Sequence, residues 1–154
     1  MDLVTHKTLQ FARPRADVWS AMGDVGSYQR WWPWLRSFEA RALASGEAWH
    51  CTVRPPLPYT VKFTIAFEDV VAERYAQAHV SGDVAGDATL TLDDTDLGCV
   101  VVVRSNLSPR STFLRLLAST FPPVARYGHD WVLSTGADQF AMRALNADER
   151  DTTT

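Results

Sequence analysis

Between Phe38 and Asn106 the sequence holds six successive segments with strand-like patterning, and one long helical segment follows them. In the clearest strand, one face is apolar and carries Val61, Phe63, Ile65 and Phe67. The turns between these segments are short, which favours an antiparallel meander. An apolar sheet face that is followed by a single apolar helix has to bury that helix, so the pattern predicts a sheet that curls around it.

The other segments complete this pattern. Two short helices are expected after the first strand: one begins at Pro14 and ends at Gly23, and the second runs from Asp24 through Trp31. A further short helix begins at Ser111, and the long helix runs from Pro123 to about Leu145. A proline-rich loop is expected at residues 55–59. The expected strands cover residues 3–11, 38–42, 49–53, 61–68, 74–81, 85–93 and 98–106.

The predicted class is therefore α+β, with a curved seven-stranded antiparallel sheet wrapped around a long C-terminal helix. Two short helices lie between the first and second strands. Residues 1–147 are predicted to form a single domain, and residues 148–154 a polar C-terminal tail.

Composition excludes several classes of protein. The 154 residues are 46% hydrophobic and 21% charged, close to the average for globular domains. The net charge is −3 and no run of basic residues is present, so nucleic acid is not expected as a partner. The longest apolar run, residues 99–103, is far shorter than a membrane helix of about 20 residues. The N-terminus carries no secretion signal, which predicts a cytoplasmic protein with two buried, reduced cysteines.

No catalytic motif is visible in the sequence. The four histidines show no metal-ligand spacing, no Gly-x-Ser-x-Gly elbow is present, and no glycine-rich loop could hold a phosphate. His129 and Asp130 are adjacent on the long helix, so their side chains are expected to diverge rather than pair as a base with its orienting carboxylate. No metal, no cofactor and no catalytic residue is therefore predicted.

The opening of the chain carries a family resemblance. A proline-led helix ends near Val18-Trp19 and is followed by Trp31-Trp32-Pro33, and this segment resembles the opening of the START-like (SRPBCC) superfamily. More narrowly, it is similar to the polyketide cyclase/dehydrase and lipid-transport family. The loop at residues 57–59, the turns at Gly82 and Gly98, and residues 128–132 also match. The resemblance covers residues 3–145 and implies a helix-grip fold with a cavity for an apolar ligand between sheet and helix.

The expected cavity wall combines inward strand faces with one stripe of the long helix. In strand 74–81 the small residues Ala76, Ala78 and Val80 are expected inside, although the opposite face, with Tyr75, Gln77 and His79, is the alternative. One of Trp31 and Trp32 is expected to pack in the core and the other to face the cavity. The predicted ligand-binding residues are Trp32, Trp49, Phe63, Phe67, Val101, Val103, Val124, Tyr127, Gly128, Trp131 and Thr135.

Gly128 needs a reason of its own, because glycine inside a helix costs about 1 kcal/mol relative to alanine. Close approach to the sheet and open cavity volume are both adequate explanations.

The predicted function is binding of a small hydrophobic or amphipathic molecule, such as a lipid or polyketide. The alternative is a cyclase, aromatase or dehydratase that uses acid–base groups in the cavity. Binding is favoured because the expected inward faces hold Ser105, Thr135 and Tyr127 but no carboxylate or histidine. The expected partner is a small hydrophobic molecule bound to a monomer or homodimer, without an integral membrane segment; docking of another protein at the proline loop is a third possibility.

Overall fold

The structure is a computed structural model in which residues 2–145 are described. Seven strands form one antiparallel sheet in the order β1-β7-β6-β5-β4-β3-β2, so the first strand completes the meander at its edge as predicted. The strands are β1 (Leu3–Phe11), β2 (Leu35–Glu39), β3 (Ala48–Val53), β4 (Val61–Val71), β5 (Tyr75–Gly82), β6 (Val84–Thr95) and β7 (Gly98–Pro109). The helices are α1 (Arg15–Met22), η1 (Val25–Ser27), α2 (Tyr28–Trp31), α3 (Thr112–Thr120), α4 (Pro122–Phe140) and the π-helical η2 (Ala141–Leu145).

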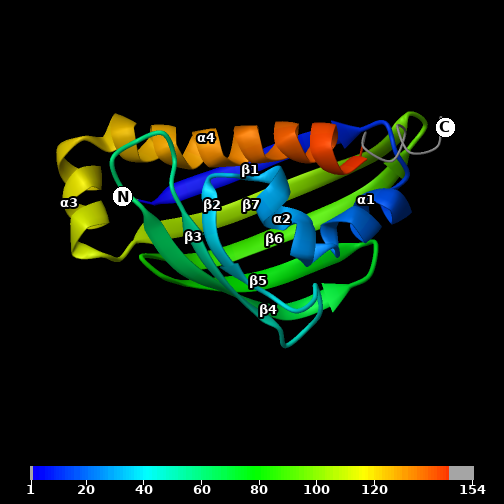
Figure 1. Cartoon of the computed structure of the whole chain (residues 1–154), viewed down its shortest axis with the longest axis horizontal. Helices are drawn as coiled ribbons and strands as arrows, with labels where there is room; N and C mark the ends of the chain where they lie inside the picture. Colours follow the sequence, from blue (N-terminus) through cyan, green and yellow to red (C-terminus); the bar gives the residue numbers. More distant parts are fainter. Residues whose placement is uncertain (1, 146–154) are drawn as a thin grey trace.

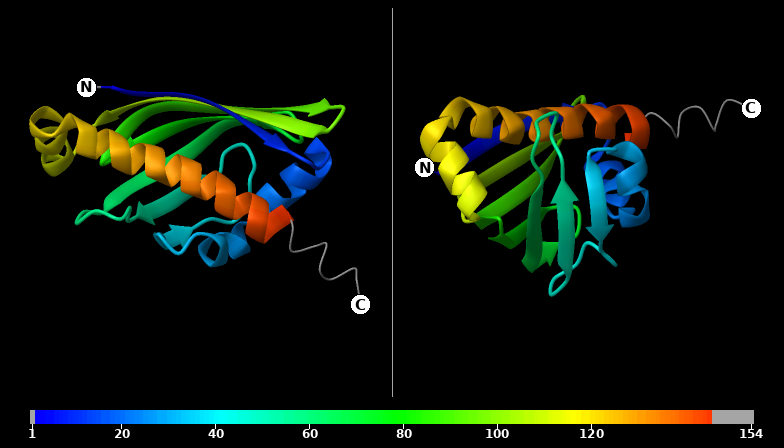
Figure 2. Two further views of the ribbon diagram at one scale, coloured as in Figure 1. Left: turned by 90° about the horizontal axis from the view of Figure 1, so that it is seen from above. Right: turned by 60° about the vertical axis from the view of Figure 1, so that its left-hand side comes forward.

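The curled sheet holds α4 along its hollow side, as Figures 1 and 2 show. Helix α3 lies at one end of α4, and α1 and α2 lie near the other end. Ser111 caps α3 by accepting a hydrogen bond from the Leu114 amide at 3.2 Å. The double proline then starts α4, where the missing amide proton of a proline costs no helical hydrogen bond. The predicted helix-grip architecture is confirmed.

The alternation of the central strands places their small and apolar residues inside. On β5, Ala76, Ala78 and Val80 are buried, whereas Gln77 and His79 are exposed, so the preferred orientation of this strand is correct. Val101 on β7 is 2% exposed. Both cysteines are free and buried, and burial raises the pKa of the Cys51 thiol to about 12.

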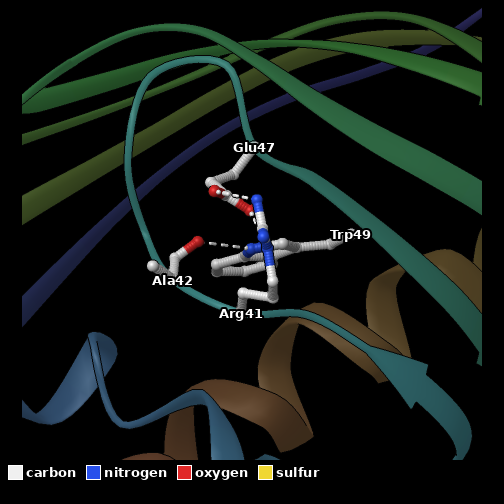
Figure 3. Close-up of polar contacts among 4 residues, drawn as sticks. All are labelled: Arg41, Ala42, Glu47 and Trp49. Atoms are coloured by element: carbon white, nitrogen blue, oxygen red, sulfur yellow. Dashed lines mark hydrogen bonds and ion pairs between the residues drawn. The ribbon is translucent and has the colours of Figure 1, made fainter.

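The second strand differs from the prediction. It covers Leu35–Glu39, so Ala40 and Ala42 lie in the following loop and not on the strand. Figure 3 shows what fixes this loop: Arg41 reaches both carboxylate oxygens of Glu47, at 3.0 and 3.3 Å, and Trp49 Nε1 donates to the Ala42 carbonyl at 2.9 Å. These bonds fold the segment over the Trp49 side chain instead of letting it extend beside β3.

Helix α4 ends at Phe140, and the chain continues as a π-helical turn to Leu145. The predicted polar tail, residues 148–154, lies outside the described residues. Within residues 2–145, no helix combines the length and the apolar character that crossing a membrane requires.

Candidate ligand-binding site

An apolar cavity of about 250 Å³ lies between the sheet and α4. Strands β1, β6 and β7 form one wall, α4 forms the opposite wall, and residues of α1 and of the segment that follows it close one end. We refer to this space as the inner cavity. Its lining residues are Lys7, Leu9, Phe11, Val18, Met22, Tyr28, Trp32, Trp34, Leu90, Val101, Val103, Val132, Leu133, Gly136, Ala137 and Phe140.

The inner cavity is small for a ligand-binding pocket. A water molecule takes about 30 Å³ of liquid, so 250 Å³ has room for about eight non-hydrogen atoms. Pockets for drug-sized ligands usually measure about 300–1,000 Å³. A larger molecule therefore cannot be enclosed in the inner cavity alone.

Aromatic side chains fill the rest of the interior. The Tyr28 ring stacks on Phe38 at a centroid distance of 5.1 Å and meets Trp49 edge to face at 5.5 Å. Trp49 meets Phe67 at 4.6 Å, also edge to face. Such pairs contribute about 0.5–1.5 kcal/mol each beyond their burial, so this cluster stabilises the fold. Trp49 and Phe67, both predicted to line the cavity, pack inside this cluster and do not line the cavity.

Two titratable side chains, Lys7 and Tyr28, belong to the cavity lining. The Tyr28 hydroxyl donates to the Met22 carbonyl at 2.5 Å. Burial, followed by the neighbouring Cys51 and Asp24, raises the Tyr28 pKa far above its ordinary value, so this hydroxyl stays protonated. Lys7 Nζ donates to Ser134 Oγ at 2.7 Å. Among the described residues, no carboxylate or histidine lines this cavity.

Trp32 and Gly136 meet at the cavity wall. Trp32 Nε1 donates to the Gly136 carbonyl at 2.9 Å, while Trp31 is 7% exposed and packs in the core. The two tryptophans therefore divide their roles as expected. A Cβ at position 136 would lie 3.3 Å from Trp34 Cζ2, so glycine lets the indole rings approach the helix closely. Sequence reasoning missed Gly136, although it is the second glycine inside the same helix.

The structure brings together only part of the predicted site. Trp32, Val101 and Val103 line the inner cavity. Phe63 is half-buried and packs against the core, and Val124 and Thr135 are half-buried on other parts of α4. Tyr127, which was expected at the cavity edge, is 53% exposed. These four side chains do not line the inner cavity.

Gly128 faces neither the cavity nor the sheet. A Cβ at this position would overlap Tyr59 Oη and lie 3.3 Å from Tyr59 Cζ and from Leu57 Cδ1. The proline-rich loop therefore packs directly on the helix at Gly128, and this contact explains the glycine. Both expected reasons, close approach to the sheet and open cavity volume, are wrong, because the close contact is with the loop.

A second, open groove of about 710 Å³ lies outside the inner cavity. We refer to it as the outer groove. The proline-rich loop and α4 form its sides, and Trp131, predicted to face the cavity, lies here instead. Trp34 lines both spaces. The groove is lined by Pro33, Trp34, Arg36, Arg54, Pro55, Pro56, Leu57, Pro58, Trp131 and Gln139.

His129 also departs from the prediction. Its Nδ1 lies 3.5 Å from Asp130 Oδ1, so the adjacent side chains approach instead of diverging. Burial lowers the His129 pKa, and the Asp130 carboxylate opposes this shift. His129 does not line the inner cavity, so the pair has no access to a ligand there. Among residues 2–145, no group of three histidine, cysteine or acidic side chains is placed to hold a metal.

The chain is similar to known proteins in structure. No protein-family model matches the sequence, and a search of the curated proteins found no match. Among solved structures, the aromatase/cyclase Zhui from Streptomyces sp. R1128 is 17% identical, with a TM-score of 0.69 over 100% of this chain and 98% of that one. Ara h 8.0201 is 10% identical, with a TM-score of 0.70 over 95% of this chain and 99% of that one.

Norcoclaurine synthase from Thalictrum flavum is 16% identical, with a TM-score of 0.64 over 94% of this chain and 87% of that one. The TM-scores of these three structures show a shared fold, whereas their identities of 10–17% leave the activity open. The similarity covers nearly the whole chain, including the seven-stranded sheet and the long C-terminal helix. The chain therefore shares the helix-grip fold of these solved structures, in which a curved antiparallel sheet holds a long C-terminal helix.

Proposed function

We propose that the protein binds a small apolar or amphipathic molecule, with the apolar part of the ligand in the inner cavity. The observation that carries this proposal is an apolar space of about 250 Å³ between β1, β6, β7 and α4. Aliphatic and aromatic side chains form nearly all of its wall, which suits burial of hydrocarbon. Lipid-like and polyketide-like molecules are the ligand classes that this lining fits, and a cytoplasmic location is part of the proposal.

The size of the cavity limits the affinity it can supply. Burying about eight carbon atoms is worth about 6 kcal/mol at about 0.8 kcal/mol for each buried methylene. Association itself costs about 4–15 kcal/mol of lost translational and rotational freedom. A ligand that ends inside the inner cavity therefore binds weakly, and a tightly bound ligand needs additional contacts outside it.

The proposal can be tested with octan-1-ol, whose chain matches the cavity volume, by isothermal titration calorimetry. Val103→Phe places a ring in the cavity and should weaken octan-1-ol binding at least tenfold. Val102→Phe, on the opposite face of the same strand, is the matched control and should leave the affinity unchanged. Equal affinities of both variants and the wild type would show that octan-1-ol does not bind in this cavity.

An acid–base enzyme of the cyclase, aromatase or dehydratase type is the second candidate. The observation that favours it is Lys7, whose side chain lines the cavity and whose amine donates to the exposed Ser134 Oγ at 2.7 Å; release of that bond would let the amine act as an acid–base group. The Tyr28 hydroxyl is less suited, because its proton is already donated to the Met22 carbonyl. Turnover of a poly-β-keto substrate by the wild type and its loss in Lys7→Met would favour the enzyme.

A further inference from the structure

The outer groove presents hydrogen-bond donors that have no protein partner. Arg36 and Arg54 both line it, and neither guanidinium has a hydrogen-bond or ion-pair partner within residues 2–145. Gln139 Oε1 accepts a bond from Trp34 Nε1 at 2.9 Å, which leaves the Gln139 amide protons free to donate. No acidic residue belongs to the described lining of this groove. The set of donors is therefore complementary to an anion.

The backbone holds these donors beside Trp34. The Arg54 amide donates to the Trp34 carbonyl at 2.9 Å, and Leu35 pairs with Val53 in the antiparallel register of β2 and β3. Pro33, Pro55, Pro56 and Pro58 form much of the remaining wall, and each fixes one backbone torsion angle. The backbone of the groove is thus preorganised, whereas the two exposed arginine side chains would be ordered by the ligand.

Trp34 separates the outer groove from the inner cavity. Its ring stacks on Trp32 at a centroid distance of 5.6 Å and meets Trp131 edge to face at 6.1 Å. Because Trp34 lines both spaces, a ligand that occupies both would contact the indole that is bonded to Gln139. The inner cavity supplies an apolar compartment for about eight atoms, and the groove supplies the charged contacts that this compartment lacks.

We infer that the ligand is an amphipathic oxyanion, whose carboxylate or similarly acidic head group binds in the outer groove at Arg36 and Arg54. Its apolar end passes Trp34 and enters the inner cavity. This inference rests on the proposed function and narrows the ligand to an anionic class. In this arrangement the two exposed arginines select an anionic head group. Trp34 lies between the polar half of the site and its apolar half.

The test compares octanoate, octan-1-ol and acetate by isothermal titration calorimetry at low salt. Octanoate should bind about tenfold more tightly than octan-1-ol, and acetate should bind more weakly than either, because it lacks the apolar chain. The double variant Arg36→Gln/Arg54→Gln should lower octanoate affinity about tenfold and leave octan-1-ol unchanged. The control Arg74→Gln/Arg104→Gln removes the same charge from exposed positions outside both spaces, and should preserve the octanoate preference.

A spectroscopic readout tests the role of Trp34. The NMR resonance of the Trp34 indole N–H should shift on addition of octanoate and remain unchanged with acetate. Equal affinities of the wild type for octanoate and octan-1-ol would overturn the anion subsite while leaving the proposed function intact. A control variant that loses the preference as fully as Arg36→Gln/Arg54→Gln would overturn it too. If neither octanoate nor octan-1-ol binds, the proposed function fails and the inference falls with it.

Discussion

Filling the inner cavity should stabilise the protein while it removes ligand binding. Ala137 lines the cavity from α4, and Ala137→Leu adds three carbon atoms there without introducing a poor helix former. Core substitutions from small to large usually cost about 1–3 kcal/mol, because a packed core has no space for the new atoms. A gain in stability from Ala137→Leu would therefore show that open volume lies next to position 137.

The expected magnitude follows from the added atoms. Three buried carbon atoms are worth about 2.4 kcal/mol at about 0.8 kcal/mol each, and fixing the leucine side chain costs about 0.5–1 kcal/mol. The net gain is about 1–2 kcal/mol, which corresponds to a rise in Tm of about 3–6 °C for a domain of this size. The new atoms take about 90 Å³ of the 250 Å³, so octan-1-ol affinity should fall at least tenfold.

Thermal unfolding followed by circular dichroism measures the first effect, and calorimetric titration with octan-1-ol measures the second. Ala72→Leu is the matched control, because Ala72 is exposed in the β4–β5 turn and gains the same atoms outside the cavity. It should change neither quantity appreciably. A lower Tm in Ala137→Leu, with unchanged affinity for octan-1-ol, would refute the reasoning, since it would show a packed wall at this position.

Three further predictions concern other parts of the molecule. Gly128→Ala should destabilise the fold through its overlap with Tyr59 Oη, and in a Tyr59→Phe background the same change should become neutral or stabilising, as chemical denaturation would show. Cys51 and Cys99 should resist labelling by a thiol reagent at pH 8, because burial raises both thiol pKa values, and both should react once urea unfolds the chain. Burial lowers the His129 pKa below 6.5, so the unfolded chain binds this proton more strongly and stability should fall as the pH drops below about 6.5. Urea denaturation at pH 7.5 and 5.5 should show a smaller loss in His129→Gln than in the wild type.

The sheet could be predicted from the sequence because its signals are local. Alternation along β4 and β5 fixes which residues point inward, and a slip of one residue would expose every apolar side chain of the strand. The position of β2 could not be predicted in this way, since Ala40 and Ala42 continue the alternation. Two contacts end the strand before Ala40: Trp49 donates a hydrogen bond to the Ala42 carbonyl, and Arg41 pairs with Glu47. The alternation of apolar residues contains no sign of either contact.

The size of the cavity was beyond sequence reasoning for a similar reason. Inward-facing apolar residues can either leave a space or fill it, and the alternation is the same in both cases. Here Tyr28 of α2 packs on Phe38 of β2 and on Trp49, and Trp49 packs on Phe67, so that this part of the interior is filled by aromatic rings. Val101 and Val103 keep an open face because they lie at the other side of the sheet, next to β1.

Helix α4 shows why a buried stripe does not identify a binding face. At about 100° per residue, the predicted stripe through Val124, Gly128 and Trp131 points about 140° away from the cavity face, which is centred near Gly136 and Phe140. Both faces are covered, one by the sheet and the cavity and the other by the proline-rich loop and the outer groove. Each face also carries a glycine where an aromatic ring approaches, Tyr59 at Gly128 and Trp34 at Gly136.

A helix covered on two sides has two apolar stripes, and periodicity alone cannot say which one meets the ligand. In this protein the distinction matters for function, because Trp34 reaches from one face of the helix to the other and lines both spaces. In the proposed site, a ligand too large for the inner cavity extends past Trp34 into the outer groove. The sequence predicts that the stripe with Trp131 faces the inner cavity, but it faces the proline-rich loop. In the proposed site this stripe still contributes to ligand binding, because Trp131 lines the outer groove.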